Sequence, residues 1–192
     1  MVIPDISNIN TVPKLFWHNV KNYSDDITMW RKQRGVWESH TWGDYGNWSR
    51  DIGHALIAQG LKSGDKISII SETRIEWVVL DMAIMGIGCI TAPVYPSNTE
   101  EQVKYIVKHS ESKVVFAEDQ EQLDKILEIW KDLPLVEKVV VIDKYYPRNL
   151  PNVISLDGYR DLGQLHRGEN TGKFEERLQL VKPTDIISFT YT

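Results

Sequence analysis

The sequence predicts an α/β fold in which a parallel sheet carries helices on both faces, a flavodoxin-like layer preceded by a β-hairpin. Over residues 66–142, short β-branched runs alternate with amphipathic helices, a pattern typical of parallel sheets. Helix-capping residues stand in front of the predicted helices. The 192 residues, 42% hydrophobic and 26% charged, are enough to bury one core, so a single domain over residues 1–192 is expected.

Residues 1–41 are expected to form an N-terminal segment that ends in the β-hairpin. Its strands are predicted at residues 27–31 and 36–41, on either side of a Lys-Gln-Arg-Gly turn. Trp30 and Trp37 are expected to cover one edge of the core, because packing is the commonest use of large aromatic side chains.

A helix is predicted over residues 42–59. Thr41 and Asp44 resemble a capping box, in which a hydroxyl and a carboxylate satisfy the free N–H groups at the start of a helix. Gly60 stands where the helix end requires a left-handed backbone, and Leu61 can fold back on the last turn.

The α/β core is expected to span residues 42–142 with four strands and three intervening helices. The strands are predicted at residues 66–71, 89–94, 113–117 and 136–142. The helices are predicted to begin at a Thr73–Glu76 capping box, at a Thr99–Gln102 capping box and at Asp119. Since ligands of such folds bind at the carboxyl ends of the strands, the positions to inspect are residues 71–74, residues 95–99 and Glu118.

The pattern becomes irregular after this core. Residues 143–184 contain several Pro, Gly and charged residues and are expected to form a surface connection with one short helix near residues 156–165. Residues 185–192 have the pattern of a strand.

Charge and composition exclude several classes of function. The formal net charge of −5 and the pI near 5.6 argue against a nucleic-acid partner, which requires clustered basic residues. Five His and a single Cys, Cys89, have no spacing typical of a metal site. The sequence has no Gly-x-x-x-x-Gly-Lys-Ser/Thr motif, so it contains no classical P-loop. It also has no signal-peptide pattern, so a cytoplasmic chain is expected. Peripheral membrane contact and a homodimer through the aromatic N-terminal region remain open.

Several segments resemble the long-chain fatty acyl branch of the AMP-forming acyl-CoA synthetases, within the adenylate-forming ligase superfamily. The resemblance is carried by Gly-Asp-Lys-Ile-Ser-Ile-Ile-Ser at 64–71, Ser-Glu-Thr-Arg-Ile-Glu-Trp at 71–77, Asp-Met-Ala-Ile at 81–84, Ala-Pro-Val-Tyr-Pro-Ser at 92–97 and Glu-Gln-Val-Lys-Tyr-Ile at 101–106. Their order and spacing match that family's pattern densely over residues 42–117. The chain is therefore expected to be the N-terminal subdomain of an adenylate-forming enzyme.

The last residues extend this resemblance. Residues 185–192 look like the strand that leads, in that family, into a Ser/Thr/Gly-rich phosphate-binding loop. The resemblance implies that Tyr191 and Thr192 lie at the edge of this loop as nucleotide-binding residues. It assigns no catalytic residue and no metal ligand within residues 1–192.

The resemblance also implies a reaction. A fatty acid attacks the α-phosphate of ATP, bound with Mg²⁺, to give acyl-AMP, and the thiol of CoA then displaces AMP. Without the loop, the chain alone is expected to be inactive. Two alternatives stay open: a non-catalytic binding or regulatory module with the same fold, and an acyl-AMP ligase that transfers the acyl group to a carrier protein.

Overall fold

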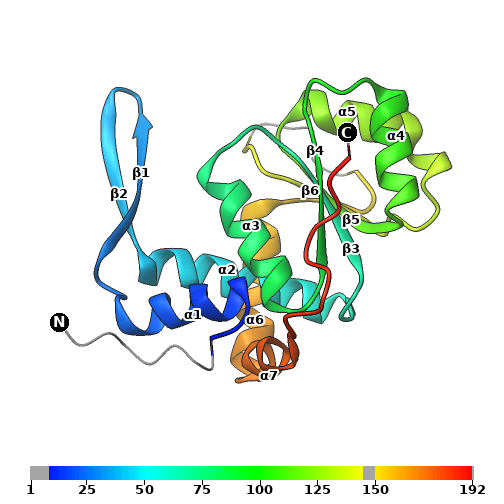
Figure 1. The fold of residues 1–192 in the computed structure, drawn as a ribbon. Helices are drawn as coiled ribbons and strands as arrows, with labels where there is room; N and C mark the ends of the chain where they lie inside the picture. Colours follow the sequence, from blue (N-terminus) through cyan, green and yellow to red (C-terminus); the bar gives the residue numbers. More distant parts are fainter. Residues whose placement is uncertain (1–8, 145–149, 192) are drawn as a thin grey trace.

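The computed structural model describes residues 9–144 and 150–191 (Figure 1). Three elements precede the sheet: α1 (Val12–Asn22), the hairpin β1 (Ile27–Gln33) and β2 (Val36–Thr41), and α2 (Trp42–Ala58). Strands and helices then alternate: β3 (Lys66–Ile70), α3 (Ile75–Gly86), β4 (Ile90–Val94), α4 (Glu100–His109), β5 (Ser112–Ala117), α5 (Gln120–Ile129), the 3₁₀ turn η1 (Trp130–Asp132) and β6 (Lys138–Val141). The chain continues through β7 (Val153–Ser155), α6 (Leu156–Glu169) and α7 (Lys173–Leu180).

The sheet has five parallel strands in the order β4-β3-β5-β6-β7. This order is that of a flavodoxin-like doubly wound fold and confirms the predicted class. The sequence predicted four of these strands. The fifth, β7, pairs Val139–Val141 of β6 with Val153–Ser155.

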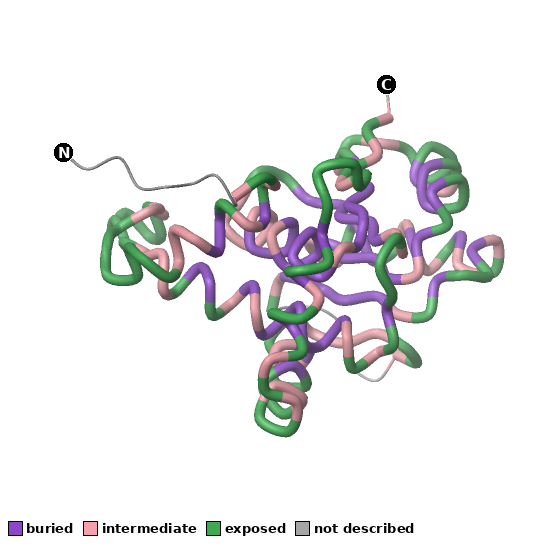
Figure 2. Tube along the Cα trace, turned by 60° about the horizontal axis from the view of Figure 1, so that its bottom comes forward, coloured by how far each residue is buried: buried purple, intermediate pink, exposed green. Residues whose placement is uncertain are grey.

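Two hydrophobic cores lie on the two faces of the sheet. On one face, α2, α3 and α6 pack on Ile67, Ile69 and Phe116, and α1 and α7 contribute Phe16, Trp17 and Phe174 to the same core. On the other face, α4 and α5 cover alternate residues of the same strands. The buried parts of the chain run through the sheet and through the inner sides of these helices (Figure 2).

Most of the residues predicted to cap a helix do so in the structure. The Thr41–Asp44 and Thr99–Gln102 capping boxes are both present. The Asp119 carboxylate accepts the N–H of Gln122, 3.0 Å away. The third predicted capping box is wrong: α3 begins after Arg74, which makes no side-chain cap bond.

The hairpin forms as predicted, but the two tryptophans do not cover the core. Arg34 (φ 49°) and Gly35 (φ 83°) make a two-residue turn, shorter than expected, of the kind that matches the twist of paired strands. Trp30 is 57% exposed and Trp37 60% exposed. The prediction for these two residues is wrong because the hairpin extends away from the sheet (Figure 1).

The segment expected to be a surface connection, residues 143–184, contains the predicted helix as α6, which is longer than expected, and adds β7 and α7. Tyr159 of α6 and Phe174 of α7 are among the largest fully buried side chains. Gly163 lies within α6 and lets this helix approach α2 closely, since a Cβ there would collide with the carbonyl oxygen of Asp51. The glycine is therefore a packing residue within a helix.

Candidate functional site at the carboxyl edge of the sheet

The carboxyl ends of the strands lie along one edge of the sheet, where open α/β folds bind their ligands. The chain passes from β3 into α3 on one face and from β5 into α5 on the other. Because β3 and β5 are neighbours, the strand order reverses between them. Residues 71–74, 95–99 and Glu118, the positions predicted from the sequence, directly follow β3, β4 and β5 at this edge.

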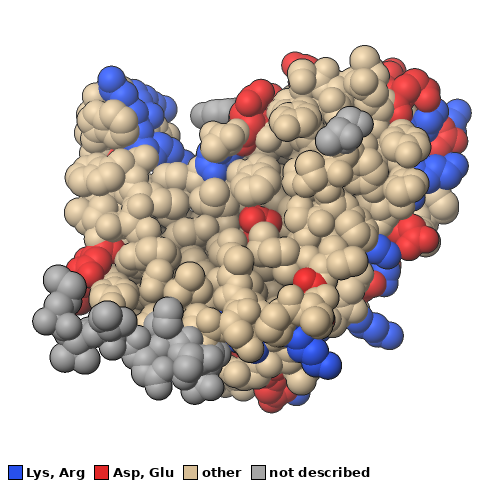
Figure 3. All heavy atoms as spheres, in the orientation of Figure 1, with Lys and Arg blue, Asp and Glu red and all other residues tan. Residues whose placement is uncertain are grey.

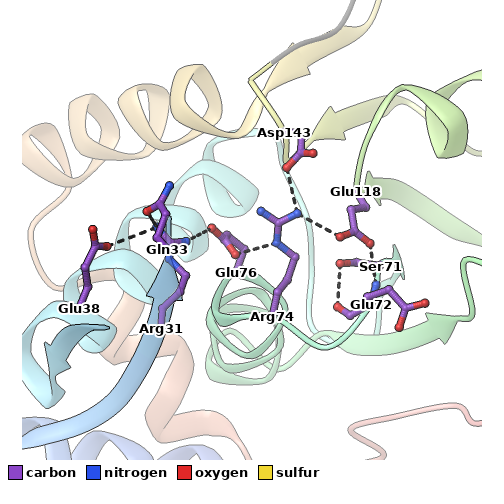
Figure 4. Close-up of polar contacts among 9 residues, drawn as sticks. All are labelled: Arg31, Gln33, Glu38, Ser71, Glu72, Arg74, Glu76, Glu118 and Asp143. Atoms are coloured by element: carbon purple, nitrogen blue, oxygen red, sulfur yellow. Dashed lines mark hydrogen bonds and ion pairs between the residues drawn. The ribbon is translucent and has the colours of Figure 1, made fainter. Parts of the chain in front are cut away.

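The reversal point is filled by ion pairs, here called the Arg74 cluster and made of Arg74, Glu76, Glu118 and Asp143 (Figure 4). Arg74 Nη1 donates to Glu118 Oε1 at 3.1 Å and to Asp143 Oδ1 at 2.9 Å. Its Nε donates to Glu76 Oε2 at 2.8 Å. One guanidinium therefore joins the ends of β3, β5 and β6 to the start of α3.

Within the Arg74 cluster, Arg74 and Glu76 each offset the effect of burial on the pKa of the other. Burial by itself raises the pKa of Glu76, but hydrogen bonds and the charges of Arg74 and Arg31 outweigh it and hold that pKa below its ordinary value. Burial acts against the charge of Arg74, yet Glu76 and Asp143 raise its pKa. The backbone N–H of Glu72 also donates to Glu118, at 2.7 Å. This part of the edge is closed by its own side chains.

The open part of the edge lies at the ends of β3 and β4. One hollow of about 250 Å³ is lined by residues that include Ser71, Trp77 and Tyr95. A second hollow of about 430 Å³ is lined by residues that include Tyr95 and Tyr105. Pro93, Tyr95 and Tyr191 line both, so the two hollows adjoin along a largely aromatic wall.

The C-terminal residues run beside β4, but the strand predicted over residues 185–192 is reduced to one bridge. Thr91 donates its N–H to Ile187 O at 3.0 Å and accepts from the N–H of Phe189 at 2.9 Å, which makes a parallel bridge between Thr91 and Ser188. Within residues 185–191, no named strand is formed. The prediction was too long because only these residues reach hydrogen-bonding distance of the edge strand.

Tyr191 lies against α4, at the border of both hollows. Its hydroxyl shares a hydrogen bond of 3.0 Å with His109 Nδ1, and its ring meets Tyr105 edge to face. It is half-buried and packs against the core beneath α4 and α5. Burial and the neighbouring Tyr105 raise its pKa. Thr192, the other predicted nucleotide contact, lies outside the described residues.

Outside the Arg74 cluster, the carboxyl group of Asp81 lies beside the edge strand β4. Asp81 of α3 is 8% exposed and accepts one hydrogen bond, from Thr91 Oγ1 at 2.7 Å. Burial raises its pKa to about 6, and the bond from Thr91 offsets this only in part. Asp81 therefore changes its charge near pH 6.

The carboxylates at this edge do not fit a magnesium site. Glu76, Glu118 and Asp143 are committed to one guanidinium, whereas Mg²⁺ requires available oxygen ligands. Over residues 9–144 and 150–191, no group of three His, Cys, Asp or Glu residues has the arrangement of a metal site.

None of the helices in these ranges is long and apolar enough to cross a bilayer.

Sequence reasoning did not identify three residues of this region. Asp143 follows β6, so the rule that directed attention to Glu118 could have found it. Tyr105 and His109 lie four residues apart on one face of α4, and that spacing could have indicated a stacked pair. Their contact with Tyr191 joins residues that are far apart in the sequence and has no local signal.

Comparison with known proteins places this arrangement in a family. The sequence model of the AMP-binding enzyme family matches residues 16–192. The long-chain-fatty-acid–CoA ligase FadD15 of Mycobacterium bovis is 29% identical over 183 residues, which are 95% of this chain and 29% of that protein. The human long-chain-fatty-acid–CoA ligase ACSBG1 is 28% identical over 153 residues, covering 80% of this chain and 21% of the relative. The chain thus spans less than a third of the length of these relatives.

Solved structures share the fold at lower sequence identity. The coronafacic acid ligase of Pectobacterium brasiliense superposes with a TM-score of 0.75 and 17% identity, over 93% of this chain and 33% of that one. The anthranilate CoA ligase AuaEII, solved in complex with anthranoyl-AMP, gives a TM-score of 0.73 and 18% identity, over 94% of this chain and 32% of that one. With a family match that covers nearly the whole described chain and with this shared fold, the protein belongs to the AMP-binding enzyme family, the adenylate-forming ligases.

Proposed function

We propose that this chain is the N-terminal part of a long-chain fatty acid–CoA ligase, which activates a fatty acid with ATP to acyl-AMP and transfers the acyl group to CoA. The observation that carries the proposal is the match to FadD15, a long-chain-fatty-acid–CoA ligase, over 95% of the chain. Magnesium would accompany ATP as part of the substrate, and its ligands would lie outside the Arg74 cluster.

In this proposal, Tyr191 and Thr192 contact the nucleotide. The position of Tyr191 supports the assignment, since it lines both hollows at the open part of the edge. A tyrosine ring offers a flat apolar face and a hydroxyl, and both can contact a nucleotide. Its bond to His109 holds the ring in one orientation before any ligand arrives.

The chain by itself is proposed to be inactive. Adenylation requires donors directed at the phosphates, and the guanidinium that could serve at the reversal point is already occupied by three carboxylates. A test is the exchange of labelled pyrophosphate into ATP by the purified 192-residue chain with a long-chain fatty acid. No exchange above the buffer rate is expected, and exchange dependent on the fatty acid would contradict the proposal.

The decisive test uses the native gene product. We expect its mass to exceed that of this chain by several tens of kilodaltons and its sequence after Thr192 to continue into a Ser/Thr/Gly-rich loop. It should form acyl-CoA from ATP, CoA and a long-chain fatty acid. A product that ends at Thr192 would favour a binding or regulatory module, and acyl-AMP that passes only to a carrier protein would favour the other alternative.

Tyr191→Phe and Tyr191→Ala in the native product test the nucleotide contact. We expect Tyr191→Ala to raise the KM for ATP about tenfold through loss of the ring contact. Tyr23→Ala is the matched control, since this exposed tyrosine at the end of α1 lines neither hollow. An unchanged KM for ATP in Tyr191→Ala would remove Tyr191 from the nucleotide site.

A further inference from the structure

The β1–β2 hairpin extends away from the body of the molecule (Figure 1). Its base is anchored: Met29 packs against the core, and the His40 ring meets the Trp48 ring at 5.0 Å. Arg31 Nη1 donates to Glu76 Oε1 of α3 at 2.8 Å and so connects one side of the hairpin to the Arg74 cluster (Figure 4). The hairpin is therefore held in a fixed orientation.

The strand register divides the hairpin residues between two faces. Trp30 pairs with Ser39 and Lys32 with Trp37, so these four side chains share one face, here called the outer face. Arg31 lies on the opposite face, which is the side that contacts α3. The outer face is thus turned away from that contact.

The outer face presents two exposed indole rings. More than half of the surface of both Trp30 and Trp37 is exposed. Lys32 Nζ lies 5.8 Å from the centre of the Trp37 ring. Large aromatic side chains with this exposure, next to a cation, are unusual on a surface that has no partner.

The charge of the hairpin is opposite in sign to that of the chain. Residues 27–41 contain Arg31, Lys32 and Arg34 but only one carboxylate, Glu38, in a chain of net charge −5. The cationic side chains gather toward the tip of the hairpin (Figure 3). Tryptophan prefers the boundary between water and lipid, and lysine and arginine are attracted to anionic lipids. Protein surfaces of net negative charge would also be complementary, but they do not require two solvent-exposed indoles.

We propose that the outer face of the hairpin docks on an anionic lipid bilayer. The rings of Trp30 and Trp37 enter the headgroup region, and Lys32 and Arg34 lie among the anionic headgroups. The Arg31–Glu76 pair sets the angle at which the rest of the molecule stands on the membrane. This inference does not depend on the proposed ligase activity.

The test is partitioning of the 192-residue chain onto sucrose-loaded vesicles, followed by sedimentation. Vesicles of phosphatidylcholine alone are compared with vesicles that also contain phosphatidylserine. Binding is expected only with phosphatidylserine, together with a blue shift of the tryptophan emission. Lys32→Ala/Arg34→Ala should lower the partition coefficient roughly 30-fold, from about a fivefold loss for each basic residue. Trp30→Ala/Trp37→Ala should abolish both the blue shift and measurable binding.

Leu165→Ala/Leu180→Ala is the matched control, since these leucines are 67% and 69% exposed on α6 and α7. It should bind like the unaltered chain. Absence of binding to phosphatidylserine vesicles, or binding that neither hairpin variant reduces, would overturn the proposal. Self-association in sedimentation equilibrium that Trp30→Ala/Trp37→Ala abolishes would also overturn it, because the outer face would then serve a second copy of the chain.

Discussion

The carboxyl edge of the sheet is closed on one side of β3 and open on the other. Toward β5, the carboxyl edge is closed by the Arg74 cluster, in which every carboxylate has a cationic partner. Toward β4, Asp81 accepts a hydrogen bond from the hydroxyl group of Thr91, and one bridge to Ser188 covers the outer side of the strand. The comparison shows that one side is closed by paired charges and that the other retains aromatic hollows and a buried carboxyl group bonded to a hydroxyl.

The largest expected effect comes from a substitution that disrupts the Arg74 cluster on the closed side. Arg74→Ala leaves Glu76, Glu118 and Asp143 close together without their common cation, and we expect the free energy of unfolding to fall by about 2 kcal/mol. Urea denaturation followed by circular dichroism measures the change. Lys108→Ala, an exposed position of α4, should change stability by less than about 0.5 kcal/mol. Equal losses in the two variants would mean that the cluster contributes nothing specific.

An intermediate effect concerns Asp81 on the open side. Its folded-state pKa, about 6, lies above its ordinary value of 3.8, so the fold favours the protonated carboxyl. That contribution is complete below pH 3.8 and is lost as the pH rises through 6. Asp81→Asn keeps an acceptor for Thr91 without the charge, and it should raise the free energy of unfolding at pH 7 by about 2 kcal/mol.

The measurement is urea unfolding of Asp81→Asn at several pH values from 4 to 8. The gain in stability should disappear toward pH 4, where the carboxyl of the unaltered chain is neutral. Asp161→Asn, an exposed position of α6, provides the control for removal of one negative charge. A gain that is independent of pH would show that Asp81 does not titrate in this range.

The smallest expected effect concerns the C-terminal residues. Tyr191→Phe removes only the hydrogen bond to His109, and we expect a loss of about 0.5 kcal/mol. Hydrogen exchange at the amide of Phe189, which donates to Thr91 O, should become a few-fold faster. Unchanged exchange would mean that the bridge to β4 holds these residues without help from Tyr191.

The parts of the fold that the sequence predicted depend on neighbouring residues. The capping box of Thr41 and Asp44 closes over three residues, and the left-handed Gly60 ends the same helix. Such signals lie within one helical turn and are readable without knowledge of the rest of the molecule. The alternation of strands and helices then indicated the parallel sheet.

The parts that were missed depend on distant residues. The need for glycine at position 163 becomes apparent only when the backbone of Asp51 is placed against it. Glu118 and Asp143, two partners of Arg74, follow two other strands and could not be chosen from spacing. The surroundings of Tyr191 are likewise set by a contact across 82 positions of the chain.

The packing of α2 against α6 and α7 also sets an order of events during synthesis. Ile52 and Leu56 of α2 belong to a core that Tyr159 and Phe174 complete, and these partners are translated about a hundred residues later. At about 5–20 residues per second, that interval lasts on the order of 5–20 s. During this time the nascent helix exposes the apolar surface that α6 and α7 later cover, and chaperones that bind nascent chains would find their substrate there.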